Sequence, residues 1–289
     1  MLIIVCLILI GYSGWNIYTA LSNYKEGADE YEQVRKQFKS KAGQDEGSQT
    51  KHRSITKTSY CHPENFYVNG YLFDTIIAKK YTFDFSALLS KNRDVQGWIS
   101  IEGTNIDYSI VQGVTNEEYL RHTIEHTFNN AGSIFLNSQV KRPFEELNTI
   151  IYGHNQRNGM MFHDLMKYKE ESFYKEHPYI EIYTPDRTYV YQVCSAYITN
   201  AFSDTYLLER NRSFTPERFL NQMMQLALYD TGAMMTQYDT FLTLSTCTNN
   251  AEEERMVVHA KRLGIKEKKF PMQTEIETKK RSSLLKIVD

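Results

Sequence analysis

The residues best suited to covalent chemistry are a cysteine and an arginine on two predicted neighbouring strands. The segment Asp239–Cys247 reads D-T-F-L-T-L-S-T-C, which predicts a buried strand that ends at Cys247. A short polar loop over 248–253 leads to a second predicted strand that begins at Arg255. Because short loops join antiparallel neighbours, we expect Arg255 to lie beside Cys247. Arginine keeps its proton, so it can favour a thiolate or donate hydrogen bonds to an oxyanion.

A cysteine nucleophile also needs a proton partner, and His154 is the best placed of the eight histidines. It follows the apolar run Thr149–Tyr152 and a glycine, so we expect it at a strand end and at the mouth of a loop. Pairing with histidine is a common way to activate a thiol, and the two residues need not be close in sequence. The alternative is that Cys247 and His154 are unrelated core residues.

A membrane-directed segment precedes the polar part of the chain. Residues 1–24 contain no charged side chain, and Leu2–Ile10 is unbroken apolar sequence. About 20 mainly apolar residues span a bilayer as a helix. A cleaved signal peptide is the alternative, with Ala20-Leu21-Ser22 as a weak cleavage site, but no basic region precedes the apolar run. We therefore expect an uncleaved transmembrane anchor over 1–24.

The remaining chain divides into three parts. Residues 25–83 are expected to form a polar linker and an N-terminal helical segment, and 265–289 a charged tail. From 84 to 264 the pattern is mainly β with helices, and its short, regularly spaced strands predict a closed β-barrel. A long helix over 215–230, with Thr215 as N-cap and Pro216 at the first position, is inserted between the late strands.

Composition excludes several other classes of protein. The 289 residues carry a formal net charge of −2 and a pI of about 6.5, which argues against a nucleic-acid partner. The four cysteines show no CxxC spacing and are too few for a disulfide framework. Cys6 and Cys194 are expected to be small buried hydrophobes.

Three motifs in this order resemble those of the sortase family, and specifically class B sortases. They are the T-L-S-T-C run that ends at Cys247, the R-M-V-V run that begins at Arg255, and I-Y-G-H-N over 151–155. Supporting stretches extend the resemblance over roughly 84–264. The helix at 215–230 and the mixed segment before the barrel favour class B over the housekeeping class.

The resemblance implies a function and its residues. Cys247 would be the nucleophile, His154 the acid/base, Arg255 the contact to substrate and oxyanion, and Ser245 a contact to the substrate peptide. Such enzymes cleave a sorting peptide between Thr and Gly or Asn, and an amine of cell-wall precursor resolves the thioacyl intermediate. They need no cofactor. They are anchored in the membrane of Gram-positive bacteria with the catalytic body outside the cell.

Three alternatives remain at this stage. His122 and His126 fit an H-x-x-E-H zinc pattern if they share a helix face, although no further acidic ligand stands out, so we expect no metal. The protein could be a tethered β-barrel binding module in which Cys247 is inert. As a sortase, it could polymerise pilins rather than attach single proteins to the wall.

Overall fold

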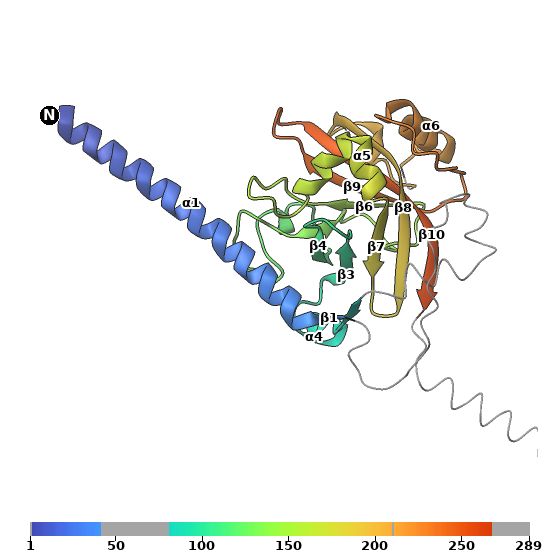
Figure 1. Cartoon of the computed structure of the whole chain (residues 1–289), viewed down its shortest axis with the longest axis horizontal. Coiled ribbons are helices and arrows are strands. Elements are labelled where there is room, and N and C mark those ends of the chain that lie inside the picture. Colours follow the sequence, from blue (N-terminus) through green and yellow to red (C-terminus); the bar gives the residue numbers. More distant parts are fainter. Residues whose placement is uncertain (1, 42–80, 210, 268–289) are drawn as a thin grey trace, which may run out of the picture.

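The centre of the molecule is a closed barrel of eight strands in the order β10-β8-β7-β3-β4-β5-β6-β9 (Figure 1). The computed structural model describes residues 2–41, 81–209 and 211–267. The predicted fold class, mainly β with helices around a closed barrel, is confirmed. The barrel strands are β3 (Val95–Ser100), β4 (Asp107–Val111), β5 (Ile134–Leu136), β6 (Asn148–Tyr152), β7 (Tyr179–Tyr183), β8 (Arg187–Asn200), β9 (Phe241–Cys247) and β10 (Glu254–Glu267).

Strand β9 illustrates why the strands read as apolar runs rather than as alternating ones. Leu242 and Leu244 belong to the main core cluster, whereas Phe241 packs with Phe219 in a second cluster beneath helix α6 (Pro216–Leu226). Both faces of the strand are therefore buried, and its side chains are apolar or small on each face.

Helix α6 begins as predicted and ends earlier than predicted. Thr215 caps it by accepting a hydrogen bond from the Arg218 amide at 3.2 Å. The backbone leaves the helical conformation at Ala227, and the Leu228 amide then donates to the Ala196 carbonyl at 2.9 Å. The bond to β8 replaces the last helical turn that the sequence predicted over 227–230.

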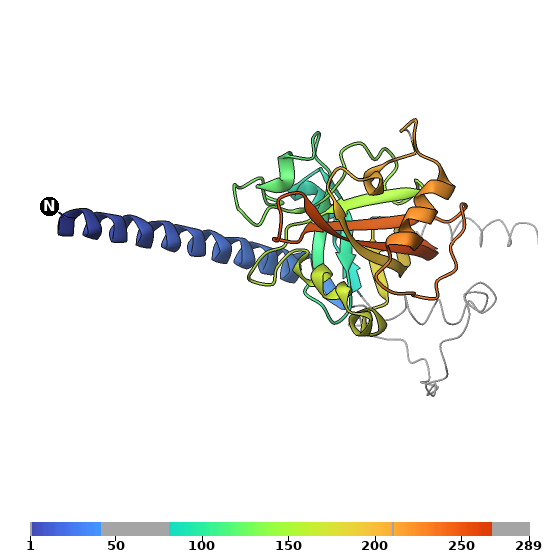
Figure 2. The same cartoon turned by 90° about the horizontal axis from the view of Figure 1, so that it is seen from above.

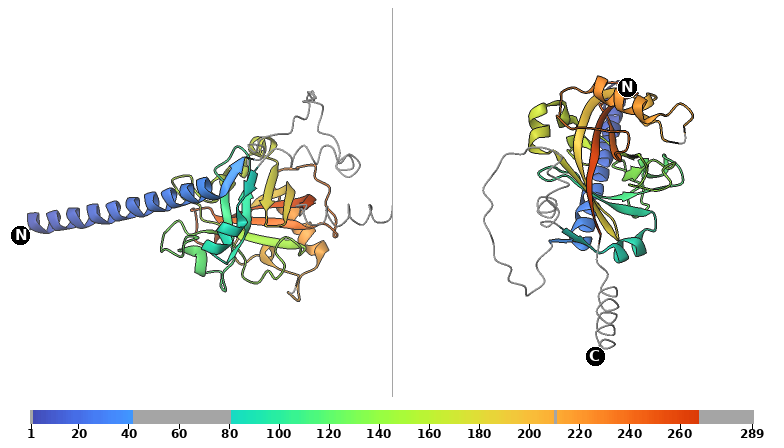
Figure 3. Two further views of the ribbon diagram at one scale, coloured as in Figure 1. Left: turned by 90° about the horizontal axis from the view of Figure 1, so that it is seen from below. Right: turned by 90° about the vertical axis from the view of Figure 1, so that its right-hand side faces the viewer.

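Helix α1 (Leu2–Phe38) is continuous and joins the apolar segment to the barrel. Its first part is exposed. Among the described residues, α1 is the one helix that is long and apolar enough to cross a membrane. Its second part buries a stripe spaced by three or four residues, made of Gly27, Tyr31, Val34 and Phe38. This part runs along the barrel beside β3 and β4 (Figure 3, left). The helical segment expected after residue 24 is thus an extension of the same helix.

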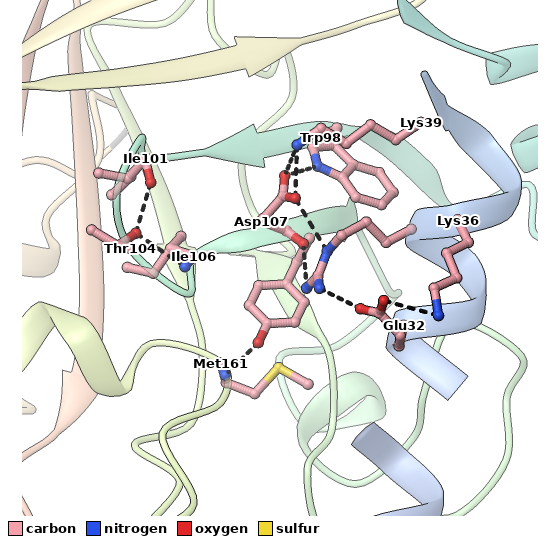
Figure 4. A network of polar contacts seen from close by, with 11 residues as sticks. Glu32, Lys36, Lys39, Trp98, Ile101, Thr104, Ile106, Asp107 and Met161 are labelled. Atoms are coloured by element: carbon pink, nitrogen blue, oxygen red, sulfur yellow. Dashed lines mark hydrogen bonds and ion pairs between the residues drawn. The ribbon is translucent and has the colours of Figure 1, made fainter. Parts of the chain in front are cut away.

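A polar cluster fastens the end of α1 to the barrel (Figure 4). The Asp107 carboxylate accepts from Lys39 Nζ at 2.7 Å and from Trp98 Nε1 at 2.8 Å, and it pairs with Arg35 Nε at 3.1 Å. Burial of the Lys39 ammonium lowers its pKa. Strand β1 (Lys39–Lys41) then pairs with β2 (Tyr81–Phe83), and the linker expected between them lies outside the described residues.

The smaller elements include one correction, at the zinc pattern. Helix α4 (Phe85–Lys91) begins after Asp84, whose side chain caps it by accepting a hydrogen bond from the Ala87 amide at 3.0 Å. Residues 122–126 do not form the helix that the zinc pattern requires: η1 (Glu118–Leu120) ends before them, and His126 has φ +59°. The segment that follows the His154 loop forms the 3₁₀ helix η2 (His163–Lys169). The other short elements are α5 (Glu171–Glu176) and η3 (Asp204–Tyr206).

Candidate active site

Cys247 and Arg255 lie opposite each other on neighbouring antiparallel strands. The register of β9 and β10 pairs these two residues directly, as the short loop between the strands predicts. Both side chains are partly exposed. Directly opposed residues in an antiparallel pair have Cβ atoms about 5 Å apart, which lets the guanidinium influence the thiol.

His154 reaches the same edge of the barrel because β6 and β9 run parallel. Tyr152 is the register partner of Ser245. Because the strands are parallel, the residues two positions later along the chain, His154 and Cys247, lie at the same level. The Gly153 amide donates to the Ser245 carbonyl at 3.2 Å, and Asn155 Nδ2 donates to the Cys247 carbonyl at 2.9 Å. These bonds fix the backbone on both sides of His154 against β9.

The imidazole of His154 is oriented by a backbone carbonyl. Its Nε2 lies 2.7 Å from the Leu120 carbonyl oxygen. A carbonyl only accepts, so Nε2 carries the hydrogen and donates it. In the neutral ring the Nδ1 lone pair is then the atom available to take a proton from another group.

The guanidinium of Arg255 is held by the loop between β9 and β10. Its Nη1 donates to the Glu252 carbonyl at 2.7 Å and to the Glu254 carbonyl at 3.1 Å. The positive charge also acts on Tyr152 and Tyr206: burial raises the pKa of both hydroxyls, and Arg255 offsets part of that increase.

Ser245 is buried behind a tyrosine that the sequence analysis did not single out. Its Oγ lies 2.8 Å from the hydroxyl of Tyr206, and the residue is 2% exposed. The Tyr206 ring, carried by η3, stacks near Tyr152 with ring centroids 6.1 Å apart. The two tyrosines flank the cysteine–arginine edge.

The other cysteines differ from Cys247 in their surroundings. Cys194 is buried as expected, and burial raises the pKa of its thiol. Cys6 lies exposed on α1, contrary to the expectation of a buried hydrophobe, because the whole apolar half of the helix lies away from the barrel. Cys61 lies outside the described residues.

Within residues 2–41, 81–209 and 211–267, no group of three or more His, Cys, Asp and Glu side chains is arranged to hold a metal ion. His122 Nδ1 instead donates to the Glu118 carbonyl at 2.8 Å. The described part of the site thus brings together a thiol, an imidazole and a guanidinium, the groups needed for covalent acyl transfer.

The chain is similar to known proteins over the barrel. Residues 99–263 match the family model described as the Sortase domain. Sortase B of Listeria monocytogenes is 35% identical over 174 residues, which cover 59% of this chain and 70% of that protein. Sortase B of Staphylococcus aureus is 34% identical over 182 residues, with coverages of 61% and 73%.

Solved structures give the same result. Clostridium perfringens sortase B is 31% identical with a TM-score of 0.57, and the match covers 62% of this chain and 99% of that one. A complex of Staphylococcus aureus sortase B with substrate is 29% identical with a TM-score of 0.58, and the match covers 69% and 92%. The similarity therefore includes the fold as well as the motifs.

Proposed function

The chain is a class B sortase, a cysteine transpeptidase, and we propose that it is anchored in the membrane and attaches surface proteins to a cell-wall amine. Its donor substrate would be a C-terminal sorting signal, cleaved between Thr and Gly or Asn. The observation that carries this proposal is that His154, Cys247 and Arg255 lie at the neighbouring ends of three adjacent strands, with His154 two residues beyond the end of β6.

The proposed reaction has two halves. The Cys247 thiolate attacks the threonine carbonyl carbon, and the resulting tetrahedral intermediate expels the amine of the next residue, which takes a proton from His154. This leaves a thioester on Cys247. The acceptor amine then attacks the thioester, His154 takes up its proton, and collapse of the second intermediate forms the new amide and releases the thiolate.

Two further residues support these steps. Arg255 would donate hydrogen bonds to the oxyanion or to the peptide backbone, and its own bonds to Glu252 and Glu254 hold it at the strand end. Ser245 is the proposed peptide contact. Because it is 2% exposed, it would act through the Tyr206 hydroxyl to which it is bonded.

The proposed location follows from α1. Its apolar part would cross the cell membrane once, and the barrel would lie outside the cell, where the wall precursor is found. The extended helix would then hold the enzyme close to the membrane.

Mass spectrometry of the protein incubated with a sorting peptide tests this function. We expect a thioester adduct at Cys247, which hydroxylamine releases, and no adduct in the His154→Ala variant. A binding module with an inert Cys247 would bind peptide without forming the adduct, and that result would overturn the proposal.

A further inference from the structure

The length of the apolar part of α1 fixes which residues lie at the membrane surface. Leu2–Leu21 is uncharged and exposed as far as its side chains are described. Twenty helical residues rise about 30 Å, which equals the thickness of the hydrocarbon core. The outer headgroup layer adds roughly 5–7 Å, so it contains about the next four or five residues, 22–26.

The barrel meets α1 within this layer. Asn129 Nδ2 donates to the Asn23 carbonyl at 2.8 Å, and the Asn130 amide donates to Asn23 Oδ1 at 2.8 Å. One turn later, a Cβ on Gly27 would lie 2.7 Å from Asn129 Oδ1, so the close approach depends on glycine there. The loop that carries Asn129 and Asn130 is therefore held at headgroup level.

This loop, residues 120–130, carries two exposed apolar side chains. Phe128 is 60% exposed and Leu120 is 37% exposed. Arg121 between them is also exposed and carries a positive charge. Aromatic and basic side chains together are typical of surfaces that rest on a phospholipid interface.

The same loop is bonded to the residues around the active site. The Leu120 carbonyl accepts from His154 Nε2, and Gln156 Nε2 donates to the Asn130 carbonyl at 2.8 Å. The turn between β9 and β10, next to Cys247, lies on the side of the barrel that faces the N-terminal half of α1 (Figures 1 and 2). With the apolar part of α1 in a bilayer, the edge with Cys247 would face that bilayer.

We propose that loop 120–130 rests on the phospholipid headgroups of the outer leaflet, with Phe128 inserted at the interface. The active site then takes its substrates at the bilayer surface, where a lipid-linked amine would be presented. This inference rests on the proposed membrane anchoring and adds the orientation of the barrel to it.

Tryptophan quenching in phosphatidylcholine–phosphatidylglycerol vesicles tests the orientation with the full chain. In a Trp15→Phe background, Phe128→Trp reports on the loop and Tyr238→Trp is the matched control. Tyr238 is 87% exposed and precedes β9, at the barrel end opposite Cys247. Trp98 is buried and contributes the same background to both variants. With a nitroxide on the lipid headgroup, we expect Phe128→Trp to lose most of its added emission and Tyr238→Trp to keep it.

Equal quenching of the two variants would overturn the proposed orientation. The native chain, quenched through Trp15 by lipids brominated in mid-chain, tests the anchoring separately. Loss of Trp15 emission with equal quenching of the variants would leave the anchoring intact and reject only the orientation. If Trp15 is not quenched, both the anchoring and the orientation are wrong. Thioester formation with a soluble peptide tests the enzymatic activity independently of both.

Discussion

Cys247 differs from Cys194 in access and in partners, which makes the second cysteine a control for the first. We expect Cys247→Ala to abolish peptide cleavage without unfolding the barrel, because the proposed reaction has no other nucleophile. Cys194→Ala should keep cleavage, since that thiol packs with Phe219 and Phe241 away from the site. Peptide cleavage and circular dichroism measure both. Turnover by the Cys247 variant would show that the wrong nucleophile was chosen.

Arg255 uses the planar shape of its side chain as well as its charge. Its Nη1 bonds the Glu252 carbonyl in the β9–β10 loop and the Glu254 carbonyl at the start of β10, which leaves the other donors of the guanidinium available to a substrate. Lysine supplies a charge without this fork. We therefore expect Arg255→Lys to lower kcat/KM by about 10²-fold, comparable to the loss of an oxyanion donor in other enzymes. A change of only a few-fold would mean that Arg255 acts by its charge alone.

His259 makes the stability of the barrel depend on pH. Its Nε2 lies 2.8 Å from the Tyr197 hydroxyl and its Nδ1 2.9 Å from Thr243 Oγ1, which donates onward to Asn148. Burial lowers its pKa from 6.5 to about 3. In the unfolded chain His259 binds a proton below about pH 6.5, whereas in the folded chain it binds one only below about pH 3. As the pH is lowered from 6.5 to about 3, the free energy of unfolding should therefore decrease by up to about 1.4 kcal/mol per pH unit.

The comparison of His259→Gln with the native chain isolates this effect. Glutamine keeps one donor and one acceptor but does not titrate, so we expect the variant to be less stable at pH 7 and to lose less stability on acidification. Urea unfolding of both proteins at several pH values measures the two slopes. Parallel slopes would show that other groups dominate the acid response.

Among the elements, α1 depends on Asp107 for its attachment to the barrel. Asp107→Asn removes the charge that faces Lys39, whose side chain is only 9% exposed. Leaving a buried ammonium unpaired costs about 3 kcal/mol. We expect trypsin to cleave after Arg35 in α1 and after Lys39 in β1 much faster in this variant. Glu32→Gln is the control, because its 46% exposed carboxylate contributes about 1 kcal/mol or less. Equal cleavage of the two variants would contradict this account.

The sequence predicted the strands near the site well and the connecting elements less well. Strands β6 and β9 are largely buried on both faces and are followed by polar loops, so their ends, and with them His154 and Cys247, were identifiable. The Tyr206 contact to Ser245 was not, because η3 reaches β9 from 39 positions away and is only three residues long. Residues 122–126 have a helix-compatible spacing, but their backbone is used in turns and in a bridge to Phe128.

At the scale of the whole molecule, the proposed anchoring makes the length of α1 set the distance between the active site and the bilayer. A polar, helix-forming insert of seven residues between Leu21 and Ser22 would lift the barrel by about 10 Å and turn it little. We expect this variant to lose transfer to a lipid-linked amine while it keeps transfer to a soluble amine. Rates measured in vesicles with both acceptors test this. Unchanged transfer to the lipid-linked amine would show that the height of the barrel does not matter.

The parallel pairing of β6 with β9 also has a consequence for the newly made chain. His154 and Cys247 become neighbours only when distant parts of the chain meet. One such contact joins Asn155 to Cys247, and these two residues are 92 positions apart in the sequence. Contacts so distant in sequence form late, because the entropy of closing the loop must first be overcome. A newly made chain in which the barrel has not yet closed therefore carries its cysteine without a partner. The onset of catalysis during refolding is thus a direct signal that the barrel has closed.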